Sequence, residues 1–294
     1  MKIDWREVDL AITEATNKDF SHADVQPLSG GDINSVYRLQ GKHQSYFVKI
    51  NQPQRLSMFE AEQAGLLEMR ATHSVRVPLP IVCAAGGCAF LVLEDLQLQS
   101  KSHAADQLLG QQLAQMHLAA QPYYGWHREN TIGLTKQLNG RYESWVAFWR
   151  EQRLGMQLTL VAEHGYTGRI QDKGEQLMLR LDSLFESYKP SPSLLHGDLW
   201  SGNAAADSHG RPVIYDPACY YGDREADIAM TELFGGFGAG FYAAYKDVYA
   251  LDVGYGSRKI LYNLYHVLNH LNLFGRGYLG QAIQMLDQLL AELG

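Results

Sequence analysis

Short runs of alternating apolar and polar residues fill the first third of the chain, and apolar residues at helical spacing fill the rest. The spaced apolar positions of residues 3–18 predict one amphipathic helix. Runs over residues 25–28, 35–39 and 46–50 then predict β-strands, because turn residues that include glycine separate them. The N-terminal part of the chain is therefore predicted to be β-rich.

The following segments complete this β-rich part. Residues 58–70 predict a helix, since several apolar side chains can share its inner side. A strand pair is predicted around Val82 and residues 89–93. The character of the sequence changes near residue 97, where we place a boundary between two lobes.

Beyond residue 97 the apolar spacing is helical. The predicted helices cover residues 107–120, 142–160 and 170–187, with a helix-rich tail from residue 227. One β-type hairpin interrupts them, within residues 194–216. A β-rich lobe over residues 1–96 and a helical lobe over residues 97–294 are typical of the α+β, protein-kinase-like two-lobed fold.

Composition narrows the class of protein. Apolar residues make up 46% of the 294 positions and charged residues 19%, which allows a sizeable core. The net charge of −7 argues against nucleic acid as a partner, because proteins that bind it carry a basic face. No apolar run approaches the roughly 18 residues of a membrane helix, and the charged N-terminus lacks a signal core. Three cysteines suit a reducing compartment, so we expect a soluble, cytoplasmic protein.

The strongest chemical signal is the string His-Gly-Asp-Leu-Trp-Ser-Gly-Asn at residues 196–203, followed beyond a hairpin by Asp216. Phosphoryl transfer needs a carboxylate beside the attacking hydroxyl and magnesium across the phosphates. Kinase loops supply an aspartate base and a metal-binding asparagine five residues later, which is the spacing of Asp198 and Asn203. Taken alone, such a pair would more simply bond turn amides. The whole string favours Asp198 as catalytic base, Asn203 and Asp216 as magnesium ligands, and His196 as a brace of the loop.

A second signal is Lys49, near the end of an apolar strand. A lysine in that place is ordinarily just an exposed strand position. Here it follows a glycine-rich hairpin and precedes a helix that bears Glu60 and Glu62. Kinases place their phosphate-binding lysine and its orienting glutamate in this order. Glu62 is the preferred partner, because its spacing leaves it off the packed face of the helix, and Glu60 is the competitor.

Two further positions complete a predicted ATP site. Gly30 and Gly31 form a weaker phosphate cradle, since the full G-x-G-x-x-G pattern is absent and the pair can simply make a tight turn. Glu94 and Leu96 fall where the hinge between the lobes is expected, and there backbone groups would bind adenine.

Other conspicuous side chains are predicted to be structural. Trp145, Phe148 and Trp149 share one side of a helix, which is more typical of core than of a ligand site. His117 lies on an apolar helix face and is expected to be a core histidine with its hydrogen bonds satisfied. Asp227 can cap the helix that follows it.

With these residues the chain resembles the fructosamine kinase (ketosamine-3-kinase) family, related to the aminoglycoside and choline kinases. The broader group is indicated by the loop at residues 196–198, the hairpin before Asp216, and Asp227-Ile-Ala. The narrower family is indicated by Trp200 within the loop and by the sequences of residues 58–62, 151–158 and 216–225. The resemblance covers most of the chain and implies that Asp227 braces the catalytic loop.

The resemblance also implies a reaction: ATP-dependent, magnesium-dependent phosphorylation of the C3 hydroxyl of a ketosamine. This is the sugar adduct that glycation leaves on lysine or protein, and a phosphate beside its C2 carbonyl makes it unstable and releases the amine. Trp200 is then a platform for the sugar or, equally, a core anchor. Ribulosamine is the preferred substrate over fructosamine.

Two other functions stay open at this point. One is a kinase of another small alcohol, such as an aminoglycoside, choline or a free sugar. The other is a nucleotide-binding pseudokinase, although retention of all four central residues argues against it: Lys49, Asp198, Asn203 and Asp216.

Overall fold

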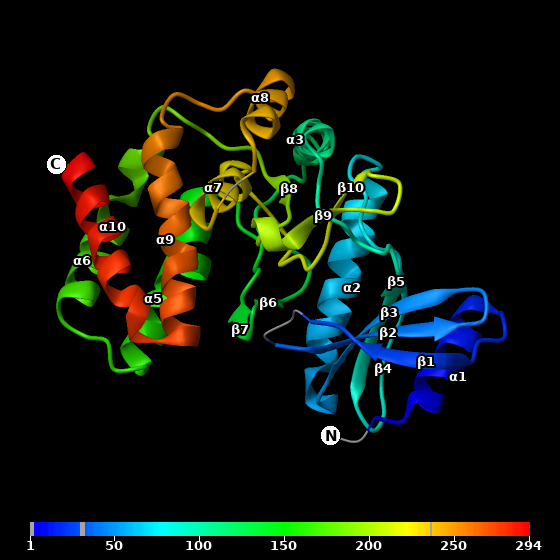
Figure 1. The fold of residues 1–294 in the computed structure, drawn as a ribbon. Helices are drawn as coiled ribbons and strands as arrows, with labels where there is room; N and C mark the ends of the chain where they lie inside the picture. The colour runs from blue at the N-terminus through cyan, green and yellow to red at the C-terminus, as the bar shows by residue number, and fades with distance from the viewer. Residues whose placement is uncertain (1–2, 30–32, 236) are drawn as a thin grey trace.

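The structure is a computed structural model and describes residues 3–29, 33–235 and 237–294. Figure 1 shows a sheet with two helices, coloured blue to cyan, beside a larger helical region coloured green to red. The two-lobed α+β arrangement predicted from the sequence is confirmed.

The N-terminal part is built on one antiparallel sheet with the strand order β1-β2-β3-β5-β4. Its elements are α1 (Trp5–Thr16), β1 (His22–Pro27), β2 (Ser35–Gly41), β3 (Ser45–Asn51), α2 (Leu56–Ala71), β4 (Pro80–Ala85) and β5 (Ala89–Glu94). Helix α1 starts where the side chain of Asp4 accepts a hydrogen bond from the N–H of Arg6. All of these elements were predicted, with ends within a few residues.

Alternation along the strands gives the sheet two different faces. Val48, Ile50 and Val92 face α1 and pack with Val8 and Ile12 of that helix. The neighbouring positions point the other way: Leu91 and Leu93 pack with residues of α2. Lys49 lies between Val48 and Ile50 and pairs with Leu91, so its side chain is directed toward α2.

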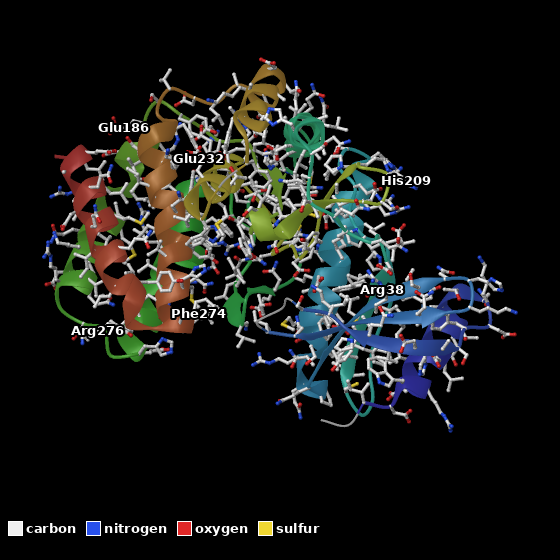
Figure 2. The ribbon with its side chains drawn as sticks, in the orientation of Figure 1. Arg38, Glu186, His209, Glu232, Phe274 and Arg276 are labelled. Atoms are coloured by element: carbon white, nitrogen blue, oxygen red, sulfur yellow. The ribbon has the colours of Figure 1, made fainter. Side chains whose placement is uncertain are left out.

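The connection to the second lobe is tied to the sheet. Arg38 of β2, marked in Figure 2, donates from Nε to the carboxylate of Asp95 at 2.7 Å. Ser45 donates to the same carboxylate, also at 2.7 Å. The chain therefore leaves β5 at a fixed point before it enters α3.

The second lobe is mainly helical and buries one continuous apolar core. Its helices are α3 (His103–His117), α4 (Trp145–Phe148), α5 (Met156–Glu163), α6 (Arg169–Arg180), α7 (Glu225–Leu233), α8 (Ala239–Val248), α9 (Tyr255–Phe274) and α10 (Leu279–Glu292). A π-helical segment, Trp149–Gly155, joins α4 to α5 within the helix predicted for residues 142–160. Trp145, Phe148 and Trp149 are buried, as predicted.

Three short strand pairs lie among these helices. They are β6 (Asn130–Ile132) with β7 (Thr135–Gln137), β8 (Ser193–Leu195) with β11 (Tyr220–Gly222), and β9 (Ala204–Ala206) with β10 (Pro212–Ile214). The prediction of a single hairpin was wrong, because β6, β7 and β11 are three residues long and too short to show alternation. In the described part of the chain, no helix is long and apolar enough to span a membrane.

Candidate active site

The loop that follows β8 carries the residues predicted to perform the chemistry. Its glycine, Gly197, has a φ of 80°, and a Cβ there would lie 2.2 Å from the main-chain oxygen of Ala218. Glycine is required at this position, because the loop passes so close to the segment after Asp216. Leu199 is fully buried and anchors the middle of the loop.

Asp227 of α7 holds this loop in place. Its carboxylate accepts hydrogen bonds from the backbone N–H groups of His196 at 2.7 Å and Gly197 at 2.8 Å. Nε2 of His117 lies 3.1 Å from the same carboxylate, and its other ring nitrogen is hydrogen-bonded to the hydroxyl of Tyr245. Both nitrogens of His117 thus have partners, as predicted for a core histidine. Burial favours the neutral acid, but the hydrogen bonds and charge of His117 outweigh it and keep the pKa of Asp227 below its ordinary value. Asp227 therefore braces the loop as an anion.

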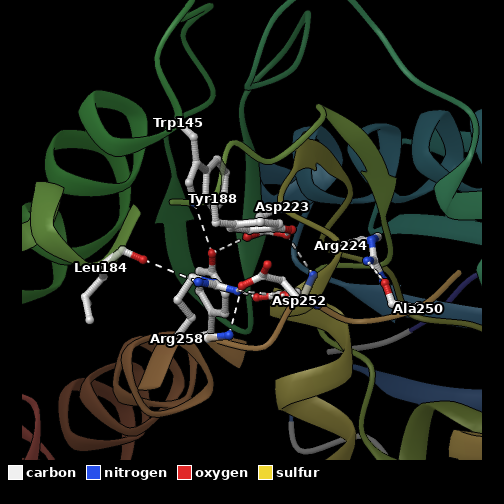
Figure 3. Close-up of polar contacts among 11 residues, drawn as sticks. Trp145, Leu184, Tyr188, Asp223, Arg224, Ala250, Asp252 and Arg258 are labelled. Carbon is white, nitrogen blue, oxygen red and sulfur yellow. Dashed lines mark hydrogen bonds and ion pairs between the residues drawn. The ribbon is translucent and has the colours of Figure 1, made fainter. Parts of the chain in front are cut away.

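The start of α7 is itself fixed by buried charges. Glu225 accepts from Nε of Arg258 at 2.7 Å, and the same guanidinium donates to Asp252 at 2.7 Å (Figure 3). Asp223, just before the helix, accepts from the hydroxyls of two tyrosines. Breaking such a buried pair leaves an uncompensated charge, so the cluster resists movement of α7 and of Asp227.

His196 is fully buried and bonds the loop on both sides. Its Nε2 lies 2.9 Å from the main-chain oxygen of Tyr215, and its Nδ1 accepts from the N–H of Asp198 at 3.3 Å. A proton on Nε2 satisfies both contacts. His196 is thus the structural brace that the sequence predicted.

Asp198 and Asn203 face each other across the loop. Nδ2 of Asn203 donates to the main-chain oxygen of Asp198 at 2.9 Å and to its carboxylate at 3.3 Å. This contact uses the amide nitrogen of Asn203 and leaves its oxygen available. Burial, together with the negative charges of Asp216 and Asp227, raises the pKa of Asp198 to about 7.

Lys49, Glu62 and Asp216 join the two lobes. Nζ of Lys49 lies 2.6 Å from Oε1 of Glu62 and also pairs with Asp216. The competitor Glu60 instead pairs with Arg128, at 3.4 Å, and does not contact Lys49. Burial alone would lower the pKa of Lys49, but the charges of Asp216 and Glu62 raise it above its ordinary value, so the lysine is cationic.

Asp216 has an unusual backbone. Its φ of 59° lies in the left-handed region, which a residue other than glycine adopts at an energetic cost. Its side chain is 45% exposed, in contrast to the buried Lys49 beside it. Strain of this kind is retained mainly where function requires the side chain in one direction. Here it directs the carboxylate into the opening between the lobes.

A cavity of about 150 Å³ lies where these groups meet. Its lining combines predicted and unpredicted residues: Ile33, Asn34, Lys49, Met58, Ala61, Glu62, Asn130, Thr131, Gly133, Asp198, Trp200, Asn203, Asp216 and Pro217. Trp200 borders it with 39% of its surface exposed, so this tryptophan is no core anchor.

The predicted adenine-binding residues, Glu94 and Leu96, are not among those that line this cavity. Glu94 pairs with Arg76 at 2.7 Å and donates its backbone N–H to the main-chain oxygen of Leu79, and Leu96 is buried. Gly30 and Gly31 lie outside the described residues.

The sequence analysis missed the contribution of β6 and β7. Asn130, Thr131 and Gly133 reach the cavity from a hairpin that the periodicity did not predict. The available signal was local: the polar pair Asn130-Thr131 is followed by Gly133, which adopts a φ of 62°. In the N-terminal lobe, Asn34 and Met58 were also missed, since neither has a distinctive spacing.

Comparison with known proteins agrees with this geometry. The sequence matches the family model described as fructosamine kinase over residues 4–292. A Synechocystis protein described as a ketoamine kinase is 46% identical, with 97% of each chain covered. A chloroplastic protein-ribulosamine 3-kinase of Oryza sativa subsp. japonica is 42% identical over 92% of this chain and 79% of that protein.

Solved structures with a similar fold include members of the same family. A crystal structure described as a fructosamine-3-kinase, from Haemophilus somnus, has a TM-score of 0.90 at 29% identity and covers 97% of each chain. An aminoglycoside phosphotransferase solved with ADP and hygromycin B has a TM-score of 0.65 at 14% identity over 98% of each chain, a likeness of fold alone. By sequence and structure together, this chain belongs to the fructosamine kinase family.

Proposed function

We propose that this protein transfers the γ-phosphate of ATP to the C3 hydroxyl of a ketosamine carried on lysine or protein. The observation that carries the proposal is the convergence of Asp198, Asn203, Asp216 and Lys49 on one cavity between the lobes. Relatives at 42–46% identity are described as ketoamine and ribulosamine 3-kinases. Ribulosamine is the preferred acceptor in this proposal.

Asp198 has the properties of a general base for this reaction. With a pKa raised to about 7, its carboxylate is matched to accepting a proton near neutral pH. Its distance from Asn203 and the brace from Asp227 fix the carboxylate in one orientation. In the proposed step, Asp198 accepts the O3 proton as O3 bonds to the γ-phosphorus and the bond to ADP breaks.

Asn203 and Asp216 fit magnesium. One carboxylate and one amide oxygen are hard ligands, and magnesium in kinase sites takes the rest of its coordination from phosphates and water. When bound, the ion would neutralise phosphate charge; Lys49, oriented by Glu62, would hold the phosphates from the other side.

Trp200 is proposed to be the sugar platform. It lies two residues after Asp198 and presents part of its ring to the cavity. An indole face covers the apolar side of a sugar carbon chain at little entropic cost. A packed core position would not leave 39% of the side chain exposed.

The rest of the ATP site follows the expected division of the chain. We propose residues 1–96 as the nucleotide-binding lobe and residues 97–294 as the catalytic and substrate-binding lobe. Gly30 and Gly31 would contact phosphates, and the backbone at Glu94 and Leu96 would contact adenine. Nucleic acid is not an expected partner, and the cytoplasmic location suggested by the three cysteines stays a prediction.

The test is ADP release with a panel of acceptors. The purified protein is given ribulose-lysine, fructose-lysine, an aminoglycoside and choline in turn, with magnesium and ATP. The proposal expects the largest kcat/KM for ribulose-lysine, and phosphorus NMR should place the ester on O3. Faster turnover of choline or the aminoglycoside, or an ester on another oxygen, would contradict it.

A further inference from the structure

The β6–β7 hairpin has no role in the chemistry described so far, although it borders the cavity. It lies between α3 and α4 in sequence and in Figure 1 it stands beside the opening between the lobes. Asn130, Thr131 and Gly133 line the same cavity as Asp198 and Trp200. We call residues 130–133 the acceptor wall.

Buried amides fix the acceptor wall to the segment that carries Asp216. Nδ2 of Asn130 donates to the main-chain oxygen of Cys219 at 2.7 Å. Nε2 of Gln137 donates to the main-chain oxygen of Ala218 at 3.1 Å and to Oδ1 of Asn130 at 2.9 Å. The wall and the Asp216 segment are therefore parts of one rigid unit.

A second layer of buried groups holds these amides. Tyr265 of α9 donates its hydroxyl proton to Oε1 of Gln137 at 2.7 Å. Arg153, fully buried, donates to Oδ1 of Asn139 at 2.7 Å, and Asn139 in turn donates to Oδ1 of Asn130 at 2.8 Å. The amide groups of Asn130, Gln137 and Asn139 thus all have partners, although Nε of Arg153 has none among the described residues, and such a network favours a single geometry. Such support is what a recognition surface needs to hold a ligand group within hydrogen-bond tolerance.

Gly133 closes one side of the cavity. A Cβ at this residue would lie 2.9 Å from Cδ1 of Leu273 and 3.5 Å from Cδ1 of Ile33. Gly133 of the wall thus lies close to two residues from other parts of the chain. They are Leu273, beside Phe274 at the end of α9 (Figure 2), and Ile33, just before β2. A side chain at position 133 would therefore collide with Leu273, which explains the glycine at this point of the cavity wall.

Thr131 is the member of the wall whose side-chain hydroxyl has no hydrogen-bond partner among the described residues. Its neighbours in β6, Asn130 and Ile132, are buried, whereas Thr131 is half-buried and lines the cavity. The network above uses the side chains of Asn130, Gln137 and Asn139 and leaves the Thr131 hydroxyl out. Thr131, whose hydroxyl can donate and accept, therefore borders the same cavity as the base Asp198.

We propose that the acceptor wall selects the sugar, with the Thr131 hydroxyl bonding a hydroxyl of the ketosamine carbon chain beyond C3. This inference rests on the proposed function and deepens it. Trp200 covers the apolar side of the sugar carbon chain, and Thr131 hydrogen-bonds to a hydroxyl on its polar side. A site built to bond a hydroxyl rejects an analogue that lacks it far more strongly than an apolar pocket does. The wall thereby favours polyhydroxylated acceptors over choline-like alcohols.

Thr131→Val tests the proposal, because valine keeps the shape and strand preference of threonine and removes only the hydroxyl. We expect kcat/KM for ribulose-lysine to fall by about tenfold, the effect of one lost hydrogen bond, with KM for ATP unchanged. Thr131→Ser should recover most of the loss. Thr159→Val, at an exposed threonine of α5, is the matched control and should behave as the wild type.

Analogues of ribulose-lysine that each lack one hydroxyl of the sugar chain identify which hydroxyl bonds Thr131. The Thr131→Val loss should vanish for one of them, as in a double-mutant cycle. Equal kcat/KM for the variant and the wild type, or a parallel rise in KM for ATP, would overturn the proposal. If the wild type ignores ketosamines, the proposed function fails at that step, before the variant is assayed. In that case the role of the acceptor wall is tested with whichever acceptor the wild type prefers. It is refuted if Thr131→Val leaves kcat/KM for that acceptor unchanged.

Discussion

Asp227→Asn should damage both the stability and the activity of this kinase. The carboxylate accepts bonds from two backbone N–H groups, at 2.7 and 2.8 Å, and contacts His117. An asparagine of the same shape has one acceptor oxygen, so its NH₂ must face one of these buried donors. One orphaned N–H and two weakened charge-assisted bonds together cost about 3 kcal/mol of unfolding free energy. A displacement of the catalytic loop by about 1 Å should lower turnover by about a hundredfold.

The assays are urea unfolding and ADP release with ribulose-lysine. Asp172→Asn is the control, because Asp172 also lies in the first turn of a helix but is exposed. Since the folded pKa of Asp227 is lowered, its stabilisation is present at neutral pH and is lost only as the pH falls through that pKa. The difference between Asp227→Asn and the wild type should therefore persist at pH 7 and narrow in strong acid. If both variants unfold alike and turn over alike, the brace is wrongly assigned.

Three further substitutions test separate parts of the site. Asp216→Asn should weaken nucleotide binding by calorimetry only when magnesium is present, since a charged oxygen ligand is lost; equal weakening in its absence would indicate a structural residue. Glu62→Gln should raise KM for ATP several-fold through the loosened Lys49, whereas Glu60→Gln should not, and the reverse order would refute the pairing. Trp200→Ala should raise KM for the ketosamine and spare KM for ATP; a change in ATP alone would exclude the platform.

The sequence was informative where one residue type at one spacing performs one task. The spacing of Asp198 and Asn203 and the position of Asp216 after a hairpin predicted groups that the fold brings to one cavity. Lys49 was placed by strand alternation, because period two directs it to the α2 face of the sheet. Even the choice of Glu62 over Glu60 agrees with the contact observed, since the spacing of apolar residues in α2 orients both side chains.

The acceptor wall was beyond the reach of such patterns. Strands β6 and β7 have three residues each, and tertiary hydrogen bonds from Asn130 and Gln137 rather than alternation define them. A buried amide looks in sequence like any loop asparagine or glutamine. Asp227 is a different case: its position alone suggested a helix cap, whereas the family resemblance implied a brace of the catalytic loop. The structure agrees with the brace, since the carboxylate accepts from the N–H groups of His196 and Gly197.

The most direct test of the central claim is Asp198→Asn assayed for ribulose-lysine phosphorylation and, in parallel, for binding of magnesium and nucleotide. The substitution keeps the size of the side chain and removes the base. Because burial and two neighbouring carboxylates disfavour the charged form of Asp198, the account predicts a urea unfolding midpoint that is equal or higher at pH 8. It also predicts nearly unchanged nucleotide affinity and turnover reduced by about 10²–10⁴. A variant that keeps more than about a tenth of wild-type turnover, against the range expected for a lost general base, would contradict the assignment of Asp198.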